Sequence, residues 1–91
     1  MTYTNLAKFR YANRKTVATL PGMKSIMLVQ TKRQIAFYLV LPALGDNDAR
    51  CILLEKHDPQ ARDCTYWKQV QERIIAEETT RAAARLASAL L

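Results

Sequence analysis

The chain has 91 residues, 49% of them hydrophobic and 24% charged, and its 14 basic side chains outnumber the 8 acidic ones. This length accommodates one domain, and the composition is that of a folded protein rather than a disordered one. No apolar run reaches the roughly 20 residues needed to span a bilayer, and the first residues lack the apolar stretch of a secretion signal. We therefore expect a single cytoplasmic domain over residues 1–91, with no cofactor, no small-molecule substrate and no membrane contact.

Positive charge is concentrated in the first half of the chain. Residues 1–45 contain seven basic residues and no acidic one, whereas residues 46–91 contain seven basic and eight acidic residues. The halves carry +7 and −1, in agreement with the net charge of +6. Clustered cations release condensed counterions when they meet a phosphate backbone, which favours a nucleic acid, DNA or RNA, as the partner. A solvated basic surface that only keeps the protein soluble is the alternative. The predicted nucleic-acid-binding residues are Lys8, Arg10, Arg14, Lys15, Lys24, Lys32 and Arg33.

The basic opening segment, residues 1–22, is compatible with three conformations. Residues 8–11 alternate charged and aromatic side chains and residues 16–20 are rich in strand formers, which predicts two strands joined by a turn at Ala12 and Asn13. Phe9 and Tyr11 would then share one side, where they either join the core or stack on unpaired bases. A single helix would instead align four apolar side chains on one face: Leu6, Phe9, Val17 and Leu20.

Two short helices are the third conformation of this segment. Leu6 and Ala7 would lie on the first helix, residues 12–13 at the turn and residues 14–17 on the second helix, with Leu20 closing the packed face. This arrangement resembles the helix-turn-helix of DNA-binding regulators, whose second helix enters the major groove. The resemblance implies that residues 13–16 face the groove. Tyr11 stands in the turn, where that family prefers glycine.

Residues 23–57 predict a β-meander. Two apolar runs rich in β-branched and aromatic residues flank the polar residues 31–33, which predicts a hairpin that presents Lys32 and Arg33 to solvent. Pro42 ends the second run, and residues 45–48 form a strong turn signal. Three successive strands without intervening helices favour an antiparallel arrangement. The expected strands are Ser25–Gln30, Gln34–Leu41 and Arg50–Glu55.

Residues 59–91 predict one long C-terminal helix. The chain beyond Asp63 has no Gly or Pro and is rich in good helix formers, and either Asp58 followed by Pro59 or Asp63 is suited to cap its start. Trp67, Val70 and Ile74 share one face, with Ile75 beside them, and are expected to pack on the sheet.

The helix changes character beyond Thr79, where its apolar positions rotate by about a quarter turn. This change predicts a homodimer interface; a helix end frayed into water is the alternative. Glu77 and Arg81 have the i, i+4 spacing of an ion pair. The predicted dimerisation residues are Ala82, Leu86, Ala89 and Leu90.

Few groups in the sequence could converge on a reaction centre. His57 has Glu55 and Asp58 as candidate acid–base partners, but a polar strand end accounts for them equally well. The turn at residues 46–48 lacks the glycine and the distant glutamate of a calcium loop. Cys51 and Cys64 are expected to be free thiols, and with a single histidine they do not complete a metal site.

The sequence therefore predicts a non-enzymatic α+β protein. Its expected architecture is an antiparallel meander of three to five strands packed by one long C-terminal α-helix. The predicted function is nucleic-acid binding of a regulatory kind. The alternative is a protein-interaction module (an inhibitor, adaptor or assembly subunit) that docks on an acidic protein surface.

Overall fold

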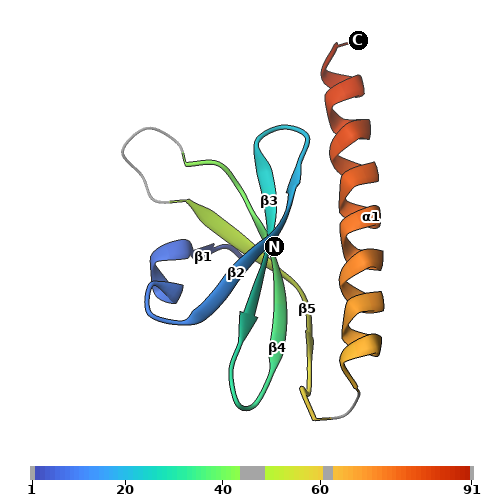
Figure 1. Ribbon diagram of the computed structural model, residues 1–91. Helices are drawn as coiled ribbons and strands as arrows, with labels where there is room; N and C mark the ends of the chain where they lie inside the picture. The colour runs from blue at the N-terminus through green and yellow to red at the C-terminus, as the bar shows by residue number, and fades with distance from the viewer. Residues whose placement is uncertain (1, 44–48, 61–62, 91) are drawn as a thin grey trace.

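The protein folds as one sheet and one long helix, as the computed structural model in Figure 1 shows for residues 2–43, 49–60 and 63–90. The sheet has five strands in the order β1-β5-β4-β3-β2, and every neighbouring pair is antiparallel. This arrangement confirms the predicted α+β class and the antiparallel meander. In chain order the elements are β1 (Thr4–Asn5), the 3-10 helix η1 (Leu6–Phe9), β2 (Asn13–Leu20), β3 (Lys24–Gln30), β4 (Ile35–Val40), β5 (Arg50–His57) and α1 (Cys64–Leu90).

The opening segment is part turn and part strand. The helix-turn-helix and single-helix predictions are wrong, because Asn13–Leu20 forms β2 and pairs along its length with β3. The two-strand prediction is right for β2 but wrong for residues 8–11. Asn5 caps η1 by accepting a hydrogen bond from the Ala7 N–H at 2.8 Å. η1 brings the Phe9 ring to 4.9 Å from that of Tyr38, so Phe9 belongs to the core, whereas Tyr11 is 94% exposed.

The meander follows the predicted order, and its strand ends differ from the expected ones by one or two residues. The turn between β3 and β4 is held by Thr31, whose hydroxyl oxygen accepts hydrogen bonds from the Arg33 and Gln34 N–H groups at 3.2 and 3.1 Å. This turn confirms the predicted hairpin tip. The predicted turn at residues 45–48 lies outside the described residues.

The larger core lies between the sheet and α1. Phe37, Ile26 and Ile74 are its fully buried side chains, and Trp67 and Ile75 pack at its edge. The predicted packing of Trp67, Val70 and Ile74 on the sheet is confirmed. In the described part of the chain no helix combines the length and the apolar character needed to cross a membrane.

Ala82 corrects the predicted dimer stripe. It is 5% exposed and belongs to the protein's own core, because α1 stays beside the sheet as far as the β2–β3 turn (Figure 1). Leu86 lies near that turn, with its Cδ2 atom 3.9 Å from the position of a Cβ atom at Gly22, and it is 44% exposed. Ala89 is exposed, and the Leu90 side chain lies outside the described residues.

The start of α1 confirms one of the two predicted caps. The Asp63 carboxylate caps the helix by accepting a hydrogen bond from the Tyr66 N–H at 2.9 Å. Asp58 instead accepts one from the Gln60 N–H, in a turn before the helix, so α1 begins at Cys64 rather than at residue 59. The predicted pair of Glu77 with Arg81 is wrong: Arg81 binds Glu78 at 2.6 Å, three residues earlier.

Candidate nucleic-acid interface

The sheet has one face toward α1 and an opposite face that carries η1, here called the η1 face (Figure 1). Under η1 lies a smaller core of Phe9, Met27, Val29 and Cys51. Strand register aligns Arg14, Val29, Ala36 and Lys56 in one row across this face. Thr16 on β2 is exposed, so η1 leaves the β2 side of the face accessible.

Four of the seven predicted cations lie at one end of the sheet. Arg14 and Lys15 follow the first residue of β2, and Lys32 and Arg33 lie in the β3–β4 turn. The register brings these segments together, because Asn13 at the start of β2 pairs with Gln30 at the end of β3. Lys56 on β5 joins them by lying in the row of Arg14. We call Arg14, Lys15, Lys32, Arg33 and Lys56 the basic end.

The remaining predicted cations are distributed differently. Lys8 is on η1, and Arg10 lies between η1 and β2. Lys24 pairs with Leu20 beside the β2–β3 turn, at the opposite end of the sheet. Arg14 points to the η1 face and Lys15 to the α1 face, because successive strand residues alternate. Arg14, Lys15, Lys32 and Arg33 therefore surround one end of the sheet rather than share one face, whereas Lys24 lies at the other end.

Lys56 was missed in the sequence because residues 46–91 are close to neutral as a whole. Only the pairing of Lys56 with Ala36, and through β3 with the row of Arg14, places it among the front-half cations. The register of distant strands is set by tertiary packing, and no local motif announces it.

The described carboxylates leave the front-half cations without ion pairs. Among the described residues, none of the seven forms an ion pair. The ion pairs present use His57, Arg73 and Arg81, all from the second half, and they engage Glu55, Glu77 and Glu78. In the described structure the ion-paired acids are thus engaged by second-half side chains, and the front-half cations keep their positive field.

Glu55 is the most strongly held of these acids. The two Arg73 N–H groups donate to its two oxygens at 2.8 and 2.9 Å, and His57 Nε2 lies 3.0 Å from Oε1. The Trp67 ring packs 5.1 Å from that of His57. Glu55 and His57, two of the three predicted acid–base candidates, therefore form with Arg73 a clamp between β5 and α1, whereas Asp58 accepts from the Gln60 N–H instead. Within the described ranges, no group of three acidic, histidine or cysteine side chains is placed to hold a metal ion.

The clamp predicts a pH-dependent contribution to stability. The hydrogen bonds from Arg73 hold the pKa of the Glu55 carboxyl below its ordinary value of 4.5, and His57 acts in the same direction against the effect of burial. A carboxyl with a lowered folded pKa stabilises the fold above its unfolded pKa, and this stabilisation is lost as the pH falls through the folded value.

Arg73→Met is therefore expected to lower the free energy of unfolding by about 1 kcal/mol at neutral pH, since the pair is partly exposed. The difference in free energy of unfolding between the variant and the unaltered protein should shrink at a pH well below 4.5. Urea unfolding at neutral pH and at such a low pH measures this difference. An equal loss at the two values would show that Arg73 acts by packing alone.

Asp58 is the acid that shares the basic end. An open hollow of about 290 Å³ is lined by Arg33, Gln34, Lys56, His57 and Asp58. Asp58 forms no ion pair there with Arg33 or Lys56 in the described structure. The Asp58 carboxylate therefore reduces the positive field at this hollow without neutralising Arg33 or Lys56.

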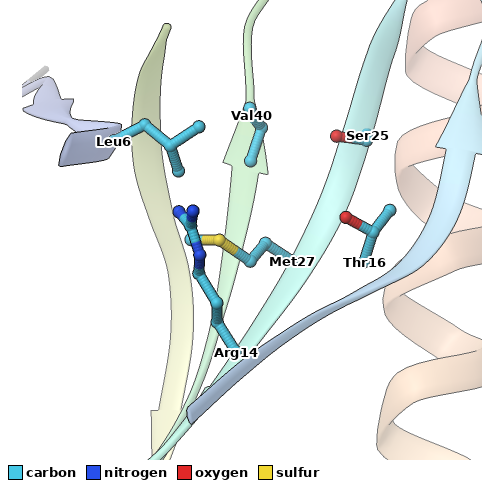
Figure 2. A pocket seen from close by; sticks show the side chains of 6 residues that line it. All are labelled: Leu6, Arg14, Thr16, Ser25, Met27 and Val40. Carbon is cyan, nitrogen blue, oxygen red and sulfur yellow. The ribbon is translucent and has the colours of Figure 1, made fainter. Parts of the chain in front are cut away.

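A second hollow, of about 280 Å³, opens on the η1 face between η1 and β2 (Figure 2). Its sides combine one guanidinium, two hydroxyls and three apolar side chains. Figure 2 shows Arg14 reaching from the start of β2 toward Leu6 and Met27, with the Thr16 and Ser25 hydroxyls on the other side. The lining residues are Leu6, Arg14, Thr16, Ser25, Met27 and Val40.

Two elements contribute positive charge at the small core under η1. Burial raises the pKa of the Cys51 thiol, and the charges of Lys8 on η1 and Arg14 on β2 oppose that rise. Both cations therefore act on the same buried point of the η1 face. No sequence pattern indicated this hollow, because its residues come from four separate elements.

No protein-family model matches the chain, and no curated protein or solved structure matches it significantly.

Proposed function

We propose that this protein binds single-stranded nucleic acid through the basic end and the adjoining part of the η1 face. The observation that carries the proposal is a set of front-half cations around one end of the sheet that form no ion pair with any described carboxylate. A phosphate backbone is a polyanion whose neutralisation by such cations releases condensed counterions and so favours binding.

Tyr11 favours a single strand over a duplex. Its side chain is 94% exposed and lies in the segment between η1 and β2, one residue after Arg10 and three before Arg14. An exposed aromatic ring among cations offers a stacking surface for an unpaired base, whereas the bases of a duplex are already stacked on one another. The cations also lie on both faces of β2, which suits a flexible strand that wraps around an edge.

A salt titration tests this proposal. Affinity for a random single strand should fall with a log–log slope of about −0.7 per phosphate contact, and it should exceed affinity for a duplex of the same length. Fluorescence anisotropy at increasing salt measures both. Absence of binding to either nucleic acid at low salt would contradict the proposal.

Tyr11→Ala is expected to weaken binding of the single strand roughly tenfold, since stacking of one base on an aromatic ring contributes about 1–3 kcal/mol. Its salt slope should not change, because no cation is removed. Tyr3→Ala is the matched control: Tyr3 is 48% exposed but lies under Arg50, with the guanidinium 5.0 Å from its ring centre. Equal affinities for Tyr11→Ala and the unaltered protein would exclude a stacking role.

Docking on an acidic protein is the second candidate function: the cations suit an acidic partner, and the end of α1 favours a contact with a protein. The helix continues beyond the β2–β3 turn (Figure 1), where Leu86 is half exposed and Ala89 exposed. Homodimerisation through these residues and a cytoplasmic location stay predictions. Sedimentation of the protein tests the former, and a monomeric mass at all concentrations would exclude it.

A further inference from the structure

We propose that the hollow lined by Leu6, Arg14, Thr16, Ser25, Met27 and Val40 receives one nucleotide of the bound strand, the base against its apolar side chains and the phosphate at Arg14. This inference rests on the proposed function and adds a specific subsite to it. Its volume of about 280 Å³ is near the lower end of small-ligand pockets, roughly 300 Å³. The hollow therefore suits one base rather than a larger ligand.

The apolar side chains provide a surface for a planar ring. Met27 is 3% exposed and belongs to the core under η1, while Leu6 and Val40 are partly buried and pack against that core. These side chains are held by packing, so the surface exists before a ligand binds. The thioether of Met27 is polarisable and adapts to an aromatic ring.

The two hydroxyls provide adaptable polar partners. Thr16 on β2 and Ser25 on β3 both line the hollow, and neither side chain has a hydrogen-bond partner within the described part of the chain. A hydroxyl both donates and accepts, so it can meet the edge of any of the bases. The hollow should accordingly accept a base without strict selection among them.

Arg14 supplies the phosphate contact. Its guanidinium has no carboxylate partner among the described residues and lines the hollow. A guanidinium binds two phosphate oxygens at once through its planar N–H groups. An acidic side chain of a protein would satisfy Arg14 but would leave the apolar side chains and the two hydroxyls without contacts. A nucleotide engages all three kinds of group.

The test compares a short oligothymidylate with an abasic strand of equal length. Ser25→Leu fills the hollow without removing charge, so it should weaken oligothymidylate binding about tenfold, leave abasic binding unchanged and preserve the salt slope. Thr16→Val removes only an exposed hydroxyl and should weaken oligothymidylate binding about threefold. Ser88→Leu, the same substitution on an exposed position of α1, is the matched control and should bind as the unaltered protein does.

The outcomes separate this inference from the proposed function. Two results would overturn the nucleotide subsite and leave phosphate binding intact. One is equal affinity of the unaltered protein for the two strands; the other is normal oligothymidylate binding by both the Ser25 and the Thr16 variant. Failure of the unaltered protein to bind either strand would overturn both proposals. If Ser25→Leu weakened binding of oligoglutamate but left binding of oligothymidylate unchanged, the hollow would be assigned to an acidic protein and the nucleotide subsite would be overturned.

Discussion

Phe37→Ala is expected to lower the free energy of unfolding by about 3–5 kcal/mol, the largest effect of any single substitution considered for this fold. Phe37 is 1% exposed and lies on β4, between β3 and β5, where it packs in the core shared with α1. Removing its ring leaves a cavity that the surrounding strands cannot close. Small domains have only about 5–15 kcal/mol of stability, so much of it would be lost.

Urea unfolding followed by the fluorescence of Trp67, which is the sole tryptophan and packs against the same core, measures this change. Leu53→Ala is the control: Leu53 is 43% exposed, and its replacement should cost about 0.5 kcal/mol or less. Similar losses for the two variants would mean that the core between sheet and helix does not dominate stability.

Replacing Lys15, Lys32 and Arg33 with glutamine is expected to weaken single-strand binding about a hundredfold at ~0.1 M salt. Each lost phosphate contact flattens the log–log salt slope by about 0.7, so three contacts change it by about 2. At ~1 M salt counterion release contributes little, so the affinities of the variant and the unaltered protein should differ little there. Over the tenfold dilution to ~0.1 M, a slope difference of 2 becomes a hundredfold difference in affinity. The three residues lie outside the hollow on the η1 face, so the change reports the basic end alone.

The control removes the same charge elsewhere. Lys24, Arg50 and Arg85 form no ion pair in the described structure and lie outside the basic end, and their replacement with glutamine lowers the net charge equally. This variant should bind nearly as the unaltered protein does. Equal weakening by both triple variants would mean that only the total charge matters and that the basic end is not a site.

Much of the fold was predictable from local patterns. The apolar runs of β3, β4 and β5 and the Gly- and Pro-free stretch of α1 each favour one conformation, and the turn at residues 31–34 separates two of the strands. The opening segment was not predictable in the same way. Residues 6–9 have no strong local preference, and the position of Phe9 depends on its contact with Tyr38, far along the chain. Tertiary contacts decided its conformation.

The candidate site was likewise only partly predictable. The charge asymmetry was visible in the sequence, but which cations lie together depends on strand register. The register separates Lys24 from the basic end and adds Lys56 to it. Ala82 has the spacing of the exposed helix stripe, yet it packs in the core because α1 follows the sheet farther than the apolar stripe of residues 67–75 indicated. The hollow at Ser25 requires four elements to converge and has no counterpart in any sequence motif.

The central claim is that the cations of the basic end, which form no ion pair with a described residue, bind a nucleic-acid strand. Mapping amide chemical shifts during titration with a short single strand tests it most directly. We expect the largest shifts in residues 10–16 and 31–34 and at Lys56, with little change in residues 82–89 of α1. Shifts concentrated in residues 82–89, or no shifts at low salt, would contradict the claim.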